Sequence, residues 1–261
     1  MSKLVLNNKT AVITGAANGI GFATTEELLK NGVSKVLLLD KKPELTEKQY
    51  AQLEACNSEA DIFYVRCDVT DKQQLEFVFY KYVLDLLGSF DILVNSVGVW
   101  ELDSNKCIDV NLIGSMHCTL LAIDVMNKEK GGTGGFIVNI TNPETTIYTE
   151  ETYGMAGFTR TLGTESMYNK TGIKLTAICP SIAKSNIMKA LVDSSASFLL
   201  MKEIFELIKK FGDGQTCPIG KSIVKVIMEK ETGSVWLSSS DTENDTGYRI
   251  SEIKFELNKY V

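Results

Sequence analysis

The sequence predicts an α/β fold: a doubly wound parallel sheet of about seven strands with helices on both faces, forming a single domain over residues 1–261. Three observations predict it. Short apolar, β-branched runs alternate with longer stretches of helical period, the strand runs are almost continuously apolar, and no Pro- or Ser-rich linker divides the chain. Continuous apolar runs are typical of parallel strands covered on both faces, and the alternation implies right-handed crossovers.

The elements follow from these runs in chain order. Apolar, β-branched segments predict strands at Thr10–Thr14, Lys35–Asp40, Ile62–Cys67, Asp91–Asn95, Phe136–Ile140, Lys174–Cys179 and Ser234–Leu237. Apolar residues at helical spacing predict helices at Thr24–Lys30, Lys72–Leu87, Ile113–Lys128 and Gly154–Asn169. Two of these helices are followed by stop signals, Asn31-Gly32 and Gly88.

Composition and charge narrow the possible functions. The net charge of −6 argues against general nucleic-acid binding, because phosphate binding requires clustered Lys and Arg. The start, MSKLVLNNKT, is too short and polar for a signal peptide, and we expect no apolar run of about 18 residues that would span a membrane. The only histidine, His117, cannot form a metal site alone, so we expect it in the core or at a subunit contact. Six scattered cysteines lack metal-site spacing and predict reduced thiols in a cytoplasmic protein: Cys56, Cys67, Cys107, Cys118, Cys179 and Cys217.

A glycine-rich loop follows the first predicted strand and opens a helix. It reads Thr14-Gly15-Ala16-Ala17-Asn18-Gly19-Ile20-Gly21. Gly15 suits the tight turn, Gly19 lets a pyrophosphate approach the backbone, and Gly21 lets the helix pack closely on the strand. The helix N-terminus offers free N–H groups and a positive dipole end to the phosphates. This arrangement predicts a Rossmann-like dinucleotide site.

Asp40, at the end of the second predicted strand, indicates which dinucleotide binds. Its carboxylate accepts hydrogen bonds from the adenosine ribose hydroxyls and repels a 2′-phosphate, which favours NAD over NADP. Lys41 and Lys42 follow and partly offset this preference, but the glycine loop itself carries no basic residue.

Further motifs resemble a known family in order and spacing. They are TGAANGIG, Cys67-Asp68-Val69, Asn95-Ser96-Val97-Gly98, Asn111 and Pro180. On these residues the chain resembles the short-chain dehydrogenase/reductase family. Within the family it is most similar to the NAD-linked 15-hydroxyprostaglandin dehydrogenases and the insect-type alcohol dehydrogenases, through the stretches GFTRTLG, GGTGGFIVNI and NGVSKVLLLD.

The resemblance implies further contacts with NAD. It places Asp68, followed by Val69, at the adenine and Asn95 near the adenosine ribose, with Gly98 in the same strand-end loop. Ser185, five residues after Pro180, stands where relatives have a Thr that contacts the nicotinamide carboxamide. Two residues depart from the family pattern: Val97 adds bulk over the cofactor, and Ser181 replaces a glycine.

The resemblance also implies a reaction centre of Tyr, Lys, Ser and Asn. A phenol titrates near pH ~10, so the family Tyr depends on a Lys four residues later to lower its pKa. Counting back from Gly157-Phe158-Thr159-Arg160 assigns the role to Tyr148 and puts Thr152 at the Lys position. The alternative, Tyr153, puts Gly157 there and breaks the downstream spacing. Under either alignment the lysine is missing.

The serine is missing as well. Asn142 occupies its place in a loop about seven residues shorter than in relatives, and Thr141 is the other candidate for the hydrogen bond. The nearby acidic residues Glu144, Glu150 and Glu151 would raise the pKa of Tyr148. Asn111 is retained, either for the proton relay or for a structural bend in its helix. The predicted catalytic residues are therefore Tyr148, Asn111 and Asn142.

Three functional hypotheses follow. The first is an NAD-binding member of the family with a degraded catalytic tetrad and weak or lost dehydrogenase activity. The alternatives are a working NAD-dependent oxidoreductase that uses Tyr148, and a structural or storage protein without cofactor. Residues 186–215 are rich in hydrophobic side chains and predict either a substrate lid for a small apolar molecule or a helix pair packed on the sheet. We also expect a homodimer or homotetramer through the helices around Asn111–Lys128 and Gly154–Asn169.

Overall fold

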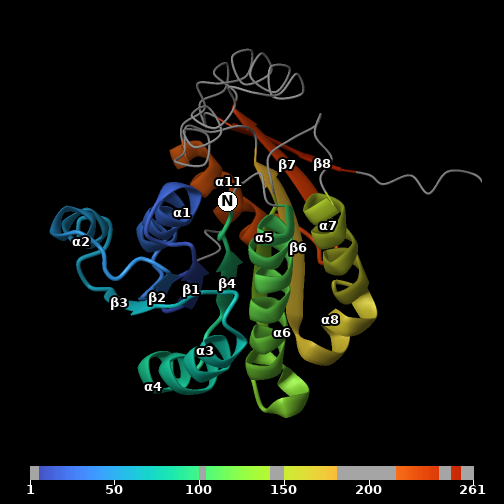
Figure 1. Cartoon of the computed structure of the whole chain (residues 1–261), viewed down its shortest axis with the longest axis horizontal. Helices are drawn as coiled ribbons and strands as arrows, with labels where there is room; N and C mark the ends of the chain where they lie inside the picture. The colour runs from blue at the N-terminus through green and yellow to red at the C-terminus, as the bar shows by residue number, and fades with distance from the viewer. Residues whose placement is uncertain (1–5, 100–103, 142–149, 181–215, 241–247, 254–261) are drawn as a thin grey trace, which may run out of the picture.

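The computed structural model describes residues 6–99, 104–141, 150–180, 216–240 and 248–253. Its centre is one eight-stranded sheet with the order β3-β2-β1-β4-β5-β6-β7-β8 (Figure 1). Every strand pair is parallel except β7 with β8. The strands are β1 (Thr10–Thr14), β2 (Lys35–Asp40), β3 (Asp61–Arg66), β4 (Ile92–Asn95), β5 (Gly135–Ile140), β6 (Ile173–Pro180), β7 (Val235–Ser240) and β8 (Tyr248–Glu252). The predicted doubly wound α/β fold is confirmed.

Helices cover both faces of the sheet because successive strand residues point to opposite sides. On one face, Ala11 and Ile13 of β1 share a core with α1 (Gly19–Lys30), α2 (Glu47–Glu54) and α11 (Thr216–Glu229). On the other face, Val12 shares a core with several of the remaining helical runs, and some of these runs stand side by side in Figure 1. The remaining runs are α3 (Lys72–Phe77), the π-helical segment η1 (Val78–Val83), α4 (Leu84–Leu87), α5 (Ser104–Cys107), the π-helical segment η2 (Ile108–Gly114), α6 (Ser115–Met126), the 3₁₀ turn η3 (Lys128–Lys130), α7 (Glu150–Leu162) and α8 (Glu165–Thr171).

The helix predictions differ from the structure at several ends. The run predicted at Lys72–Leu87 is helical throughout, but a π-helical segment replaces its centre. The run predicted at Gly154–Asn169 breaks in two, because Thr164 caps a new helix through the Met167 N–H. At that break a Cβ on Gly163 would lie 2.5 Å from the backbone N of Gly233, so the chain passes close there.

One continuous helical run contradicts the expectation about membrane spans. Residues 105–126 are long and apolar enough to cross a bilayer by length and composition, with a mean hydropathy of 1.3. One face of this run is buried on the sheet, including Val110, Cys118, Ala122 and Met126. A helix that packs in the core of a fold passes the same test, so this measure alone assigns no membrane role.

The strand order creates the crevice in which a ligand binds in this kind of fold. The chain winds from β1 outward to β3 and then crosses back to β4 on the other side of β1. Ligands of open α/β sheets bind outside the carboxyl ends of the strands at such a switch point. Thr14, Asn95 and Asn139 stand in register at these ends.

Candidate functional site

The glycine loop between β1 and α1 has the geometry that its three predicted roles require. Gly15 has φ +66°, and a Cβ there would lie 2.7 Å from the Ser96 carbonyl oxygen, so the loop touches the end of β4. A Cβ on Gly21 would lie 2.3 Å from the carbonyl oxygen of Gly15, so only glycine lets α1 pack this closely. Gly19 has φ +54°, and no residue that the structure describes lies within 4 Å of the place where its Cβ would stand. The backbone at Gly19 is therefore open to a ligand.

The N-terminus of α1 is suited to an anion. The N-cap residue is Asn18, whose side chain makes no capping hydrogen bond, and the first turn carries no acidic residue. The first-turn amides, which include those of Gly19 and Ile20, lack partners four residues earlier within the helix. Free amides and the positive end of the helix dipole together favour phosphate binding. The loop residues thus fit the pyrophosphate of a dinucleotide.

Asp40 ends β2 beside the glycine loop, as predicted. Its Oδ2 accepts a hydrogen bond from the Ala17 N–H at 3.0 Å, and its Oδ1 accepts one from the Lys42 N–H at 3.1 Å. An ionised carboxylate has about four lone-pair positions, so it can accept ribose hydroxyls in addition to these two bonds. The structure therefore brings Asp40 and the loop together and fixes the carboxylate without using all of its capacity.

Asp68 and Val69 follow β3, and their side chains differ in position. Asp68 is exposed, and hydrogen bonds from the Thr70 N–H and hydroxyl lower the pKa of its carboxyl, with smaller help from the charges of Lys41 and Lys106. An ionised, exposed carboxylate is available to a ligand. The Val69 side chain is buried, and its Cγ2 lies 2.7 Å from where a Gly114 Cβ would stand. It packs the segment after β3 against the continuous helical run of residues 105–126.

The side chain of Asn95, a residue predicted near the adenosine ribose, is bonded to other parts of the protein. Its side chain is completely buried, and its Nδ2 donates to the Ser115 carbonyl, the Thr119 hydroxyl and Asn139 Oδ1 at 2.8–3.2 Å. These acceptors belong to α6 and β5, so the amide links the sheet to that helix. The place of Asn95 near the adenosine ribose stays a prediction, and these hydrogen bonds show what its side-chain amide contacts within the protein. The half-buried residues Val97 and Gly98 follow in the same strand-end loop.

Asn111 lies within η2, the π-helical part of the long helical run. Its Oδ1 accepts from the Val99 N–H at 2.8 Å, and its Nδ2 donates to the Val99 carbonyl at 2.9 Å. Both ends of the side-chain amide are thus engaged with one backbone residue of the loop after β4. This pairing agrees with the structural alternative for Asn111, at the place where the helix departs from α-helical geometry.

Thr141, at the end of β5, is the other candidate for the position of the missing serine. Thr141 is buried, and its hydroxyl donates to Cys179 Sγ at 2.8 Å, at the end of the neighbouring strand β6. Burial raises the pKa of the Cys179 thiol, so this pair is neutral. The Thr141 hydroxyl is thus directed to the neighbouring strand, and its role as an alternative to the serine stays a prediction. Asn142, Tyr148, Ser185 and the lid at 186–215 lie outside the described residues, and Pro180, at the end of β6, is buried.

The start of α7 lies against the helix that carries Asn111. A Cβ on Gly154 would lie 2.9 Å from Leu112 Cδ2, so the two helices approach closely at that point. α7 begins at Glu150, which places Thr152 in its first turn and Tyr148 just before it in the sequence. Tyr153, the competing tyrosine, is 50% exposed. The structure thus brings α7 and Asn111 together beside the carboxyl ends of β4 and β5.

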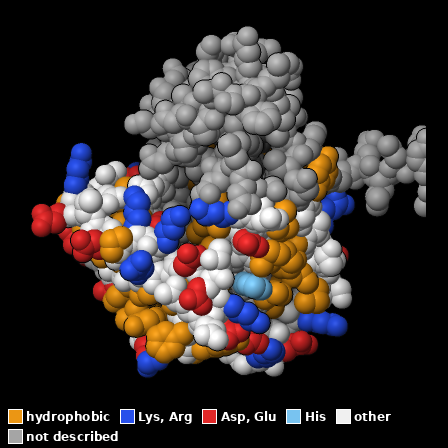
Figure 2. Space-filling view, in the orientation of Figure 1, with side chains coloured by type: hydrophobic (Ala, Val, Ile, Leu, Met, Phe, Trp, Pro, Cys, Tyr) orange, Lys and Arg blue, Asp and Glu red, His pale blue; other side chains and the backbone are white. Residues whose placement is uncertain are grey.

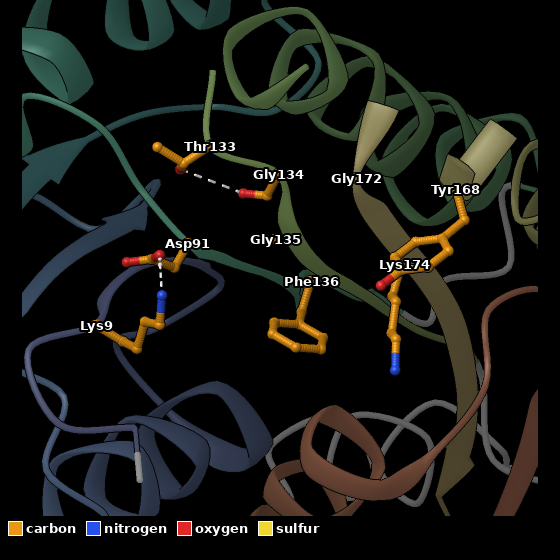
Figure 3. Close-up of a pocket in the computed structure, with 9 residues that line it drawn as sticks. All are labelled: Lys9, Asp91, Thr133, Gly134, Gly135, Phe136, Tyr168, Gly172 and Lys174. Carbon is orange, nitrogen blue, oxygen red and sulfur yellow. Dashed lines mark hydrogen bonds and ion pairs between the residues drawn. The ribbon is translucent and has the colours of Figure 1, made fainter. Parts of the chain in front are cut away.

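A small cavity at the other edge of the sheet is not this site. It has a volume of about 210 Å³ and lies at the amino ends of the strands, between Gly134, Phe136 and Gly172 (Figure 3). Lys9 Nζ and Asp91 pair across one side at 2.6 Å, and Lys174 lies over the rings of Phe136 and Tyr168 at 5.9 and 5.8 Å. These charges are already partnered, and ligands of such sheets bind at the opposite, carboxyl ends.

One residue that contacts the glycine loop is absent from the sequence predictions. Gln49 of α2 donates from Nε2 to the Ala17 carbonyl at 2.7 Å. The same side chain forms a capping box with Thr46. The spacing Thr46-x-x-Gln49 is a known signal of a helix N-terminus and would have predicted α2. It would not have predicted the bond to the loop.

Comparisons with known proteins agree with this geometry. A family described as short chain dehydrogenase matches residues 9–196. The 15-hydroxyprostaglandin dehydrogenase (NAD(+)) of Rattus norvegicus is 36% identical over 198 residues, covering 71% of this chain and 72% of the relative. Alcohol dehydrogenase 2 of Ceratitis cosyra is 27% identical over 247 residues, covering 91% and 93%. The crystal structure of NAD+-bound xylitol dehydrogenase has a TM-score of 0.70 at 22% identity, covering 88% of this chain and 96% of that chain, and shows a similar fold.

Proposed function

Because the chain belongs to the short-chain dehydrogenase/reductase family, we propose that it binds NAD(H) and works as an oxidoreductase on an apolar secondary alcohol or its ketone. The observation that carries the proposal is the loop at Gly15–Gly21 beside Asp40. Gly19 presents open backbone at a helix N-terminus, and the Asp40 carboxylate is fixed to the same loop through the Ala17 N–H. The relatives named as NAD(+)-linked 15-hydroxyprostaglandin dehydrogenases support the same cofactor and a hydrophobic hydroxylated substrate.

The parts of the reaction divide between the cofactor and the chain. When bound, NAD supplies the hydride acceptor, and NADH the donor. The chain's residues hold it: first-turn amides of α1 bind the pyrophosphate, Asp40 binds the adenosine ribose, and the exposed Asp68 lies ready for the adenine. Tyr148 moves the proton of the substrate oxygen, and Asn111 fixes the loop after β4 through Val99.

The missing lysine affects which protonation state of Tyr148 is available to the reaction. With Thr152 in the Lys position, no lysine stands four residues after Tyr148 to lower the pKa of its phenol, so we expect little phenolate at neutral pH. Oxidation of an alcohol needs that phenolate as base. Reduction of a ketone needs the protonated phenol as acid, which is abundant. We therefore propose NADH-dependent ketone reduction as the favoured direction near neutral pH.

A second candidate is a family member that binds NAD(H) or an apolar ligand but turns over little or no substrate. The observation that favours it is the pair of departures at Thr152 and Asn142. Losing a matched general base costs about 10²–10⁴-fold in rate. The relatives are named as dehydrogenases, and this supports the first proposal over the second.

Two experiments test both candidate functions. The protein is titrated with NADH while the NADH fluorescence is recorded, and it is screened for turnover of apolar ketones and secondary alcohols. The first proposal expects saturable binding and turnover that requires Tyr148. Saturable binding without turnover on any substrate or at any pH selects the second candidate. Absence of NADH binding refutes the first proposal and leaves of the second only a protein that binds an apolar ligand, next to the structural or storage hypothesis.

We also propose that two copies associate through η2, α6 and α7. Ile113, Leu120 and Tyr153 are 38%, 47% and 50% exposed on these elements, and hydrophobic side chains gather over α6 and α7 in Figure 2. Only 28% of the apolar run within residues 105–126 is buried inside one chain. Covering such a surface stabilises an oligomer, which supports the expected homodimer or homotetramer.

The proposal includes a reducing, cytoplasmic environment. Cys56, Cys67, Cys118 and Cys179 are free thiols in the described structure, and three of these four are buried. Burial raises the pKa of Cys67 to about 12, which suppresses the reactive thiolate. Cell fractionation with an antibody against the protein tests the location.

A further inference from the structure

Gln49 connects the capping of α2 to the nucleotide loop. Its Oε1 accepts hydrogen bonds from the Thr46 N–H at 3.0 Å and the Thr46 hydroxyl at 2.9 Å, while its Nε2 donates to the Ala17 carbonyl at 2.7 Å. Both ends of one side-chain amide are therefore used. α2 is itself anchored, because Leu45, just before it, and Leu53 within it are buried in the core. The bond thus joins a fixed helix to the loop.

The peptide units around Ala17 are held on two sides. The Ala17 N–H donates to Asp40 Oδ2, and the Ala17 carbonyl accepts from Gln49. In a trans peptide the N–H points opposite to the preceding carbonyl. A carbonyl of Ala17 that is directed at α2 therefore directs the N–H of Asn18 away from α2. Asn18 is the N-cap of α1, and its extended backbone leads directly into the open Gly19.

We propose that Gln49 is a positioning residue for the dinucleotide: it sets the orientation of the Ala17–Asn18 peptide and so prepares the loop for the pyrophosphate. It acts through the loop backbone without touching the ligand. The inference rests on the proposed NAD(H) binding. A loop that is ordered before binding loses less conformational entropy when the ligand arrives, so Gln49 strengthens NADH binding.

Gln49→Glu separates this role from helix capping. The glutamate keeps an acceptor for Thr46, and a negative charge in the first turn of α2 suits the helix dipole. It loses the donor to the Ala17 carbonyl. Gln52→Ala is the matched control, because Gln52 lies on the same helix and its Nε2 donates at 2.9 Å to Glu26 of α1, away from the loop.

Two measurements on the full chain test the proposal. Calorimetry should show NADH binding weakened about 3- to 10-fold in Gln49→Glu, the range expected for one hydrogen bond, with Gln52→Ala binding like the wild type. Each variant loses one hydrogen bond, so both should show a similar small fall in the unfolding midpoint. ¹⁵N relaxation should show the order parameter of the Asn18 N–H falling from about 0.85 towards about 0.6 in Gln49→Glu alone, without ligand.

The outcomes separate this proposal from the function on which it rests. Unchanged affinity in Gln49→Glu overturns it, whether or not the loop becomes more mobile, and so does an unchanged order parameter at Asn18. If wild-type protein does not bind NADH, the proposed function fails. The relaxation data then still show whether Gln49 holds the loop.

Discussion

Replacing Gly19 by alanine should separate nucleotide binding from folding. Gly19 has φ +54°, a conformation that L side chains adopt at a cost of about 1–2 kcal/mol. Among the described residues none lies within 4 Å of the new Cβ, so backbone strain is the expected effect on the free energy of unfolding. In a chain of 261 residues, this loss lowers the unfolding midpoint by about 2–8 °C. The new methyl group occupies the open face where we expect the pyrophosphate.

Gly88 provides a matched control at the end of α4. It also has a positive φ, +74°, and no described residue within 4 Å of the position of a Cβ. Gly88→Ala should also lower the unfolding midpoint through backbone strain, because Gly88 has ψ −50° and an L side chain is strained in that conformation too. Since Gly88 follows a helix that is not part of the nucleotide loop, its replacement should leave NADH binding unchanged.

Calorimetric titration with NADH compares the two variants. Gly19→Ala should bind NADH at least about tenfold more weakly than the wild type, which corresponds to about 1.4 kcal/mol. Gly88→Ala should bind as the wild type does. Equal affinity in both variants would refute the argument that the dinucleotide crosses the backbone at Gly19.

Three further predictions concern the cofactor, the assembly and one acidic group. Asp40→Ala should narrow the difference between NADH and NADPH affinity in calorimetry, because the carboxylate that repels a 2′-phosphate is gone; equal affinities in the wild type would contradict it. Leu120→Glu should give a monomer by light scattering at micromolar concentration, because Leu120 is 47% exposed on the proposed contact face, and an unchanged particle mass would argue against that face. The lowered pKa of Asp68 means that its stabilising contribution is present above about pH 3.9, its unfolded value, and is lost as pH falls through the lower folded pKa. Thr70→Ala should raise that pKa in an NMR titration, and an unchanged value would reject the Thr70 hydroxyl as a contributor.

The fold was predictable from the sequence wherever burial leaves a strong pattern. Strands β1, β2 and β4–β6 are continuously apolar because helices cover both faces, and their expected positions match to within one residue. β8 was missed because it is a short antiparallel edge strand in which only Tyr248 is buried, so it shows no apolar run. α2 was missed for a related reason: Leu53 is its only fully buried residue.

The glycine loop was also predictable, since tight turns and close packing restrict the residue type itself. The direction of a strand-end side chain was not. Asn95 carries no local signal that its side-chain amide donates to Ser115 and Thr119 of α6. Thr141 carries no local signal that its hydroxyl donates to Cys179. Such choices depend on partners far along the chain. The bond from Gln49 to Ala17 spans 32 residues and belongs to the same class.

One pH series tests the proposed activity most directly. The rates of NADH-dependent ketone reduction and of the reverse oxidation are measured from pH 6 to pH 10 in wild type and in Tyr148→Phe. We expect reduction to be measurable and nearly constant at neutral pH, since the Tyr148 phenol stays protonated below about pH 10. Oxidation should rise about tenfold per pH unit towards pH 10, and Tyr148→Phe should remove both activities. Brisk oxidation at pH 7 would contradict the argument from Thr152. The same rates in Tyr148→Phe and wild type would contradict the assignment of Tyr148.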